Sequence, residues 1–379
     1  MARWARHGGA AALLAALSVG GQALGQGAAG GADAKPSELR AVPAETLAAK
    51  YRDPSWRAPR TSWGDPSLEG VWSTDDMRSV PLNRPEELGE RETLTPEAFQ
   101  ERASRDESGR DRAINTETFL RNEWGVRTFG YTSLVIDPPN GRIPPMTEAG
   151  RARAGNRDRG TFGPGPFNTF EDFTLYDRCI TRGVIGSTLP VIYGNGMRIV
   201  QTPTHVAISY EMIHDTRIIP LDGRPHLSGD IRQYLGNPRG HWEGDTLVVE
   251  TTNFTDRTSI GPNGNGTRHS EQMKITERFT RVDPEMIEYI ARVVDPVTYT
   301  APFTIRLMIT TQPGYQIYEY SCHEGNGAVS HALSGERAYE REVAEARAKG
   351  LPIPPRGGSG NIYRAPEEGA EIIDINAGE

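Results

Sequence analysis

The stretch Gln201–Phe254 decides the fold class, and it reads QTPTHVAISYEMIHDTRIIPLDGRPHLSGDIRQYLGNPRGHWEGDTLVVETTNF. Apolar and polar residues alternate along much of it, as in half-buried β-strands, and Gly, Asp, Asn and Pro separate the runs as in hairpin turns. The stretch therefore predicts β-structure that carries polar groups of functional interest. Ionisable residues stand where a plain core strand would carry Val, Ile or Leu: Glu211, His214, Asp215, Arg217 and Glu250.

Strand-like runs continue on both sides of this stretch. Tight-turn signals at 242–246 and 282–285 join neighbouring runs, and no helical crossover pattern separates them. We therefore predict a mainly β fold: an antiparallel meander, expected as a lipocalin-like barrel, with short peripheral helices and a C-terminal helix. The expected strands are 131–136, 197–202, 204–213, 216–220, 231–235, 246–254, 272–282, 286–294, 304–311 and 316–322, and the expected helices are 95–103, 147–154 and 334–349.

The two ends of the chain read differently from its middle. Residues 1–25 have a basic start, an apolar run at 10–19 and a small-residue cleavage site, as in a signal peptide. Residues 26–60 are expected to be a flexible leader, 61–350 a single β-rich domain and 351–379 a C-terminal tail. The protein is therefore expected to be periplasmic or secreted.

The charge balance argues against some partners. The chain carries a formal charge of -8, and loss of Arg3 and Arg6 with the signal peptide gives -8 - 2 = -10. An acidic surface repels phosphate groups, so we expect no nucleic-acid partner. No later apolar run is long enough to cross a bilayer, so no membrane insertion is expected.

The chain has two cysteines, Cys179 and Cys322. An oxidising compartment favours a disulfide between them. A free thiol that acts as a nucleophile is the alternative.

One strand face carries a single acid. In the run 272–282, Glu277 shares a face with Met273, Ile275 and Phe279. If Asp283 and Pro284 form a two-residue turn, Glu277 lies diagonal to Arg292 on the next strand. The sequence then predicts an interior Glu277–Arg292 pair, either as a buried ion pair that fixes the register or as the polar floor of a ligand cavity.

The candidate catalytic residues are His214, Glu211 and Glu277. A histidine titrates near neutrality and needs a carboxylate to orient it, and Glu277 or Glu211 would do so. On a regular strand Glu211 and His214 point to opposite faces, so another strand's carboxylate is the better partner for His214. The candidate substrate-binding residues are Arg217, Arg292, Glu250 and His323.

Several other chemistries lack their motifs. The patterns HExxH, GxSxG and GxxxxGK[ST] do not occur. We therefore predict no metal site and no cofactor. Carboxylate-pair chemistry on sugars stays open, because several glutamates lie within strand-like runs.

Two resemblances add to this interpretation. Gly70-Val71-Trp72 at the first expected strand is similar to the G-x-W signature of lipocalins, which implies a barrel around a ligand cavity. Residues 65–335 resemble a family of secreted bacterial proteins of unassigned function. That resemblance implies no mechanism. It is carried by Asp137-Pro138-Pro139-Asn140-Gly141-Arg142-Ile143-Pro144, Arg217-Ile218-Ile219-Pro220-Leu221-Asp222-Gly223-Arg224, Trp242-Glu243-Gly244-Asp245-Thr246-Leu247-Val248-Val249-Glu250-Thr251 and Cys322-His323-Glu324-Gly325-Asn326.

These observations lead to one main functional hypothesis. We expect a cofactor-independent enzyme that acts on a small, moderately apolar molecule by hydrolysis, elimination or isomerisation. The alternative is a non-catalytic periplasmic protein that binds a small ligand in the same cavity. A structural envelope protein would explain the fold but not an interior glutamate.

Overall fold

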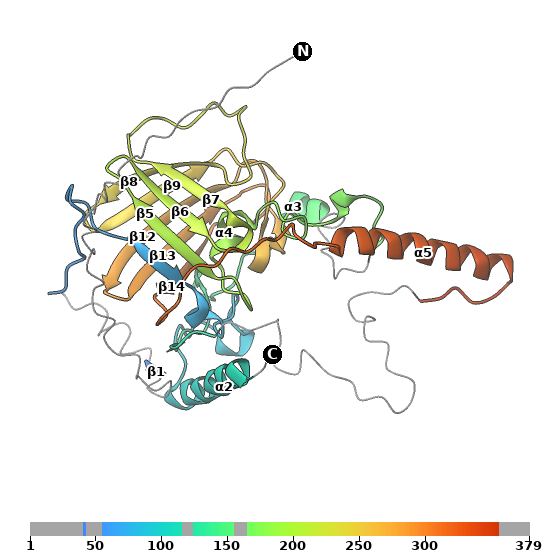
Figure 1. Cartoon of the computed structure of the whole chain (residues 1–379), viewed down its shortest axis with the longest axis horizontal. Coiled ribbons are helices and arrows are strands. Elements are labelled where there is room, and N and C mark those ends of the chain that lie inside the picture. Colours follow the sequence, from blue (N-terminus) through green and yellow to red (C-terminus); the bar gives the residue numbers. More distant parts are fainter. Residues whose placement is uncertain (1–40, 43–54, 116–123, 155–164, 356–379) are drawn as a thin grey trace, which may run out of the picture. The chain divides into compact units, whose positions relative to one another are not determined.

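The strands of the main sheet follow the chain order with one exception. The sheet is antiparallel and runs β7-β6-β5-β2-β14-β13-β12-β9-β8, with β4 paired to β14; β2, the first of these strands in the chain, lies between β5 and β14 (Figure 1). The predicted mainly β, antiparallel fold is therefore confirmed. The strands are β2 Gly70–Ser73, β4 Val135–Asp137, β5 Gly196–Gln201, β6 His205–Tyr210, β7 Thr216–Pro220, β8 Asn237–Glu243, β9 Thr246–Thr252, β12 Lys274–Asp283, β13 Met286–Val294 and β14 Phe303–Thr310.

The computed structural model describes residues 41–42, 55–115, 124–154 and 165–355. The predicted signal peptide, most of the predicted leader and residues 356–379 lie outside these ranges. Two short ladders complete the described β-structure. Strand β1 (Ala41–Val42) pairs with β3 (Thr128–Phe129), and β10 (Ser259–Ile260) pairs with β11 (Thr267–Arg268).

The two ends of the main sheet meet without forming a ladder. Strands β7 and β8 end the hydrogen-bonded order, so the described strands form no closed barrel. Their side chains nevertheless pack together. A Cβ added at Gly240 in β8 would lie 2.8 Å from both Ile219 in β7 and Leu221 just beyond it. The sheet therefore curls until its edges touch through side chains alone.

Large side chains fill the inside of the curled sheet. Trp72, Phe279, Tyr289 and Phe303 are each at most 2% exposed and come from β2, β12, β13 and β14. Phe279 and Tyr289 stack across β12 and β13, with ring centroids 4.9 Å apart. The alternation of β12, which points Ile275, Glu277 and Phe279 inward, was predicted correctly.

The described residues contain four α-helices, and none of them is long and apolar enough to cross a bilayer. Thr95 and Thr147 cap α2 and α3 as predicted, accepting from the backbone N of Ala98 (3.3 Å) and Gly150 (3.0 Å). Ser334 does not cap a helix, because its hydroxyl donates to His331 O within α5. The helices are α2 Pro96–Asn115, α3 Glu148–Ala154, α4 Gly183–Thr188 and α5 Ala328–Ala348, with 3₁₀ turns η1 Asp75–Met77, η2 Glu86–Leu88, η3 Phe170–Asp172, η4 Met212–His214 and η5 Pro262–Gly264.

Helix α2 continues to Asn115, twelve residues beyond Ala103, where the predicted helix 95–103 ends. The charged run after Ala103 is helical because part of it is buried by polar contacts. Arg102 donates to the carbonyls of Phe129 (2.9 Å) and Tyr131 (2.6 Å), and Asp106 accepts from Thr128 Oγ1 (2.8 Å). A charge count alone does not reveal such contacts.

Two expected strands do not form. Residues 231–235 make only an isolated bridge, Gln233 with Phe254. Residues 316–322 have no regular structure and end at the disulfide. We call residues 311–327 the tethered segment, because Cys322 joins it to the body of the protein.

Candidate functional site

A fully buried ion pair crosses the inside of the sheet. Arg217 on β7 donates to Glu277 on β12 through both terminal nitrogens, Nη1 to Oε1 at 2.8 Å and Nη2 to Oε2 at 2.5 Å. Tyr289 on β13 also donates to Oε1, at 3.0 Å. Opposite charges and hydrogen bonds thus satisfy the Glu277 carboxylate from two sides. This pair joins β7, at one end of the strand order, to β12, near the other end, and so stabilises the fold.

The predicted Glu277–Arg292 pair is wrong. Glu277 is opposite Ala291, and Arg292 is opposite Thr276, so Arg292 lies on the outer face with a side chain that is 51% exposed. The chain turns at Pro284 and Glu285, with an irregularity after Arg281, one residue later than the assumed turn. A slip of one residue moves every side chain of a strand to the other face. The only described ion partner of Arg292 is Asp137, at 3.9 Å.

His214 and Glu211 lie outside the regular strands. Tyr210 ends β6, and Glu211 precedes the turn η4, in which Ile213 and His214 have positive φ values. This turn interrupts the alternation on which the prediction of opposite faces depended. Each residue then contacts the tethered segment: Tyr315 Oη donates to Glu211, and His214 Nε2 lies 4.0 Å from Glu319 Oε1.

The remaining candidates do not join these residues. Glu250 on β9 is exposed and lies opposite Thr276, on the outer face that also carries Arg292. His323 is exposed in the tethered segment, next to the disulfide. The structure therefore brings Arg217 together with Glu277, and Glu211 and His214 to the tethered segment, but it does not gather all the candidates at one cavity.

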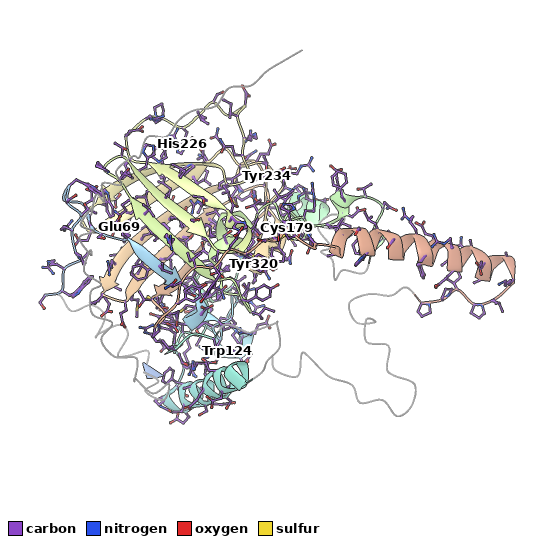
Figure 2. The ribbon with its side chains drawn as sticks, viewed as in Figure 1. Glu69, Trp124, Cys179, His226, Tyr234 and Tyr320 are labelled. Carbon is purple, nitrogen blue, oxygen red and sulfur yellow. A yellow bond between two sulfur atoms is a disulfide. The ribbon has the colours of Figure 1, made fainter. Side chains whose placement is uncertain are left out.

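The predicted disulfide is present. Cys179 and Cys322 are joined with an S–S distance of 2.09 Å. Asn326 donates to the carbonyl of Asp177 at 2.9 Å, so the tethered segment is held beside the loop before α4. Figure 2 shows Cys179 and Tyr320 at this same end of the sheet.

Tyrosines gather around the disulfide. The rings of Tyr193 and Tyr320 stack with centroids 6.1 Å apart, and the Tyr193 hydroxyl also bonds to Tyr176 and Tyr320. Burial raises the pKa of Tyr320 to about 12 and raises that of Tyr176 further, so these two hydroxyls stay protonated near neutral pH. We call Tyr176, Tyr193, Tyr210 and Tyr320 the tyrosine cluster.

Arg182 lies among these tyrosines. Its side chain is 2% exposed, and its Nη1 donates to the carbonyl of Gly194 at 3.2 Å. Its Nε and Nη2 are buried and have no hydrogen-bond partner, and none of the described carboxylates forms an ion pair with it. Burial lowers the pKa of Arg182 to about 10, against the opposing effect of the tyrosine cluster, so the group is still charged at neutral pH.

A small cleft adjoins Arg182. Its empty volume is about 180 Å³, including the open mouth. Hydroxyl groups and two arginines dominate its walls, so it suits a ligand with hydrogen-bonding groups. The lining residues are Thr174, Leu175, Thr181, Arg182, Arg257, Thr258, Ser259 and Gly264.

Two of the lining threonines bond to titratable groups behind them. Thr181 donates to Asp215, whose pKa is raised by burial. Thr258 bonds to Nε2 of His269, while the His269 Nδ1 lies 3.0 Å from the carbonyl of Ser270. Burial lowers the pKa of His269 to about 4, so this imidazole is neutral at physiological pH. It then donates from Nδ1 and accepts from Thr258.

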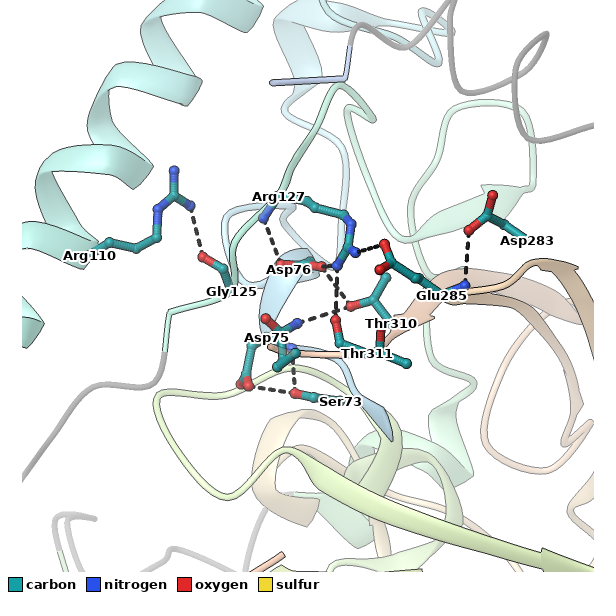
Figure 3. Close-up of polar contacts among 11 residues, drawn as sticks. Ser73, Asp75, Asp76, Arg110, Gly125, Arg127, Asp283, Glu285, Thr310 and Thr311 are labelled. Atoms are coloured by element: carbon teal, nitrogen blue, oxygen red, sulfur yellow. Dashed lines mark hydrogen bonds and ion pairs between the residues drawn. The ribbon is translucent and has the colours of Figure 1, made fainter. Parts of the chain in front are cut away.

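A second buried ion pair lies where β14 meets β2. Asp76 accepts from the backbone N of Arg127 at 2.8 Å, from its Nη1 at 2.9 Å and from Thr310 at 2.6 Å (Figure 3). Arg127 Nη2 also donates to Glu285 at 2.6 Å. A Cβ at Gly125 would fall 2.0 Å from Asp76 Oδ1, so the loop packs directly on the pair. Arg127 compensates the buried charge of Asp76, so this network has the features of a structural contact.

The sequence interpretation missed Arg182 and the tyrosine cluster. Arg182, Tyr176 and Tyr193 lie outside the expected strands, but Tyr176 and Tyr320 precede Cys179 and Cys322 by three and two residues. Once the disulfide is assumed, residues flanking the two cysteines must meet, and that spacing was the available signal. Among the described residues no group of three or more His, Cys, Asp and Glu side chains could hold a metal ion.

Comparison with known proteins gives no relative. No family model matches the chain, and searches of curated proteins and of solved structures return no match. The resemblance to a family of secreted proteins stays a prediction that rests on the sequence strings quoted above.

Proposed function

We propose that this is a periplasmic or secreted protein that binds a small molecule at the end of the sheet held by the disulfide. The observation that carries the proposal is the meeting of a hydroxyl-lined cleft and the tyrosine cluster at one buried residue, Arg182. Aromatic walls with a few convergent polar groups are typical of small-molecule sites. The disulfide supports an oxidising compartment.

The size of the cleft limits the ligand. The volume of about 180 Å³ overstates the room inside the cleft, because no water-sized sphere fits between its walls and neighbouring side chains must shift to admit a ligand. The proposed ligand is therefore a small one, with a ring or a short chain beside the tyrosines and polar groups toward the threonines.

The proposed binding mode differs from that of a lipocalin. A lipocalin-like barrel would hold its ligand inside, between the strands. Here Trp72, Phe279, Tyr289 and the Arg217–Glu277 pair occupy the inside of the curled sheet. These residues favour a ligand at the end of the sheet, and a barrel architecture in the strict sense stays a proposal.

Acid–base catalysis is the second candidate function. The observation that favours it is the position of His214 and Glu211 at the tethered segment, where each contacts a side chain of that segment. His214 is half-exposed, so a substrate in solvent can reach it. In this version of the proposal the ligand is a substrate and His214 is the acid or base.

Filling the cleft tests the site. We expect Leu175→Phe, which enlarges a lining residue, to weaken binding of a small-molecule hit at least tenfold by isothermal titration calorimetry. Leu227→Phe, on an exposed loop residue away from the cleft, is the matched control and should leave the affinity unchanged. Equal affinities of the two variants would show that the hit binds elsewhere.

The two functions separate at His214. In a catalyst, His214→Ala abolishes turnover of the bound molecule and leaves its affinity within a few-fold of the parent. In a binding protein, no product forms from the ligand with either the parent or the variant, as followed by mass spectrometry of the ligand. Loss of affinity in His214→Ala with no turnover in the parent would make His214 a contact residue.

A further inference from the structure

We propose that the ligand carries a carboxylate, or a similar oxyanion with two oxygens side by side, and that the Nε–Nη2 edge of Arg182 binds it. This inference rests on the proposed small-molecule function and adds the chemical class of the ligand. Arg182, the carbonyl of Gly194 to which it donates and the tyrosine cluster all belong to the part of the chain that the structure describes.

The unpartnered atoms of Arg182 lie on one side of the guanidinium. Nε and Nη2 form the edge of the planar group that can donate two parallel hydrogen bonds, and both lack a partner. The third nitrogen, Nη1, is used by the carbonyl of Gly194. A carboxylate fits such an edge with two oxygens at once, which is the most specific contact that arginine makes.

Arg182 makes fewer contacts than the other buried arginines. Arg84 and Arg102 also lack a carboxylate partner among the described residues, but each donates at least two hydrogen bonds, whereas Arg182 donates one. Arg217 has Glu277 as a bidentate partner, and Arg127 has both Asp76 and Glu285. A buried charge without a counter-charge costs several kcal/mol, so buried charges are normally paired. Arg182 has one carbonyl contact and no carboxylate among the described residues. A bound anion would supply the missing charge.

The tyrosine cluster suits an anion better than a cation. Tyr176, Tyr193 and Tyr320 form a chain of hydroxyls, and burial raises the pKa of Tyr176 and Tyr320, so these two can donate hydrogen bonds. Tyr193 and Tyr320 are half-buried, and they connect the surface to the buried guanidinium. The rings also give apolar contact to the carbon skeleton of a small acid.

Access to Arg182 depends on the tethered segment. The backbone hydrogen bonds of residues 312–325 that the structure describes are local, such as Tyr315 N to Gln312 O and Cys322 N to Tyr320 O. The segment is therefore attached to the body by side chains and by the disulfide rather than by a strand ladder. Such attachment allows Tyr320 to move aside while Cys322 stays in place.

The experiment compares matched acids and amides. The full mature protein is titrated by calorimetry with benzoate, cyclohexanecarboxylate and hexanoate, and with the corresponding neutral amides. We expect the acids to bind and the amides to bind at least tenfold more weakly. Because a hydrogen bond to a charged group is worth about 1.5–3 kcal/mol, Arg182→Met should weaken binding of the acids by roughly 10- to 100-fold.

Two variants separate charge from geometry. Arg182→Lys keeps the positive charge but loses the two parallel N–H donors at Nε and Nη2. It should therefore also weaken binding of the acids about tenfold or more. Arg278→Met removes one positive charge from the exposed outer face and should leave all affinities unchanged. If the Lys variant binds like the parent, charge alone suffices and the bidentate geometry is refuted.

Each remaining outcome decides between the claims. Equal binding of acids and amides that is lost with Leu175→Phe overturns the oxyanion inference and keeps the small-molecule function. Preferential binding of acids that survives in Arg182→Met also overturns the inference, because the anion then binds elsewhere. If no member of the panel binds at millimolar concentration, the proposed function itself fails.

Stability provides a readout that does not need a ligand. If Arg182 is kept for binding, removing its uncompensated charge should leave the melting temperature unchanged or raise it, as for other unpaired buried charges replaced by apolar groups. A clear fall in the melting temperature of Arg182→Met would mean that ordered water or the tyrosines stabilise the guanidinium, and that its role is structural.

Discussion

Buried arginines in this protein differ in what balances their charge. Arg217 shares two hydrogen bonds with Glu277, and a third group, Tyr289, donates to the same carboxylate. Arg182 has a single carbonyl. Arg217, which is paired with a carboxylate, holds two strands together. Arg182, which has no carboxylate partner among the described residues, keeps N–H groups that can donate to a ligand. The difference separates an anchor from a candidate site, although both groups are equally hidden from solvent.

Breaking the Arg217–Glu277 pair on one side should be costly. In Glu277→Gln the Arg217 charge stays buried without its counter-charge, and we expect the free energy of unfolding to fall by about 3–5 kcal/mol in urea denaturation. Replacing both partners by Arg217→Met with Glu277→Leu should cost less than this single change. Arg278→Met, which breaks an exposed pair with Glu243, is the control and should cost under about 1 kcal/mol.

His269 should make stability depend on pH. Burial holds its pKa at about 4, against the ordinary value of 6.5, so the unfolded chain takes up this proton first as the pH falls. The contribution of His269 to the free energy of unfolding is complete above pH 6.5. It is lost progressively as the pH falls to about 4, and the loss amounts to about 3 kcal/mol. His269→Gln should flatten the urea-denaturation stability profile across that window. Parallel profiles of parent and variant would contradict the assignment.

At the scale of elements, the tethered segment stands out because it is held without a ladder. Its main attachments are the disulfide, the contact of Tyr315 with Glu211, and Asn326 with Asp177. The sheet beside it is continuous, with β12 paired along most of its length to β13 and β9. Local stability should therefore differ sharply between the two, since strand ladders open together and isolated attachments do not.

Removing the disulfide tests this difference. The bond closes a loop with a sequence separation of 143, for which chain entropy predicts up to about 5 kcal/mol of stabilisation. We expect the double variant Cys179→Ser with Cys322→Ser to lose most of that stability in urea and to be cleaved by a protease first within residues 311–327. Cleavage that begins in another segment would show that side-chain contacts alone hold the tethered segment.

Elements with a strong two-residue period were predictable, and elements held by tertiary contacts were not. The run 272–282 was recognised from its alternation, and β12 occupies Lys274–Asp283. The run 316–322 also alternates, but Tyr320 and Cys322 are used for the tyrosine cluster and the disulfide, and no strand forms. The position of Glu277 inside the sheet was predicted correctly, whereas its partner depended on a turn that lies one residue later than assumed.

The candidate site was the least predictable part. Arg182 stands in Thr181-Arg182-Gly183, a sequence typical of an exposed turn, and only the fold buries it. His214 was predicted as a catalytic acid or base from its residue type, but its position on η4 depends on positive φ values that no alternation pattern reveals. Burial without a partner is a property of the folded molecule.

At the scale of the whole molecule, the sheet is completed by close packing where its edges meet. Strands β7 and β8 touch at Gly240, where a larger residue would overlap Ile219 and Leu221. The Arg217–Glu277 pair supports the same contact from inside, because it links β7 to β12 across the interior. The shape of the curled sheet thus depends on one small residue at its rim and one ion pair within it.

A side chain at Gly240 should force the edges apart. We expect Gly240→Val to lower the free energy of unfolding by about 1–3 kcal/mol, since the neighbouring atoms are the ends of side chains that can shift in part. Gly229→Val, at a position with open space around it, is the matched control. Thermal denaturation that shifts equally in both variants would mean that the edges are not packed as described.

The position of β2 has a consequence for the order in which the protein can fold. Strands β5 to β7 form one set of neighbouring hairpins, and β9 is likewise next to β8 and β12 next to β13, so most pairings can form soon after synthesis. Strand β2 is made before all of them but joins β14, the last to be made, through Ser73 and Thr310. Loop closure over that span is entropically slow. We expect two sets of strands, β5 to β7 and β8 to β14, to form early. The insertion of Gly70–Ser73 between these two sets should then limit the rate at which the native sheet forms.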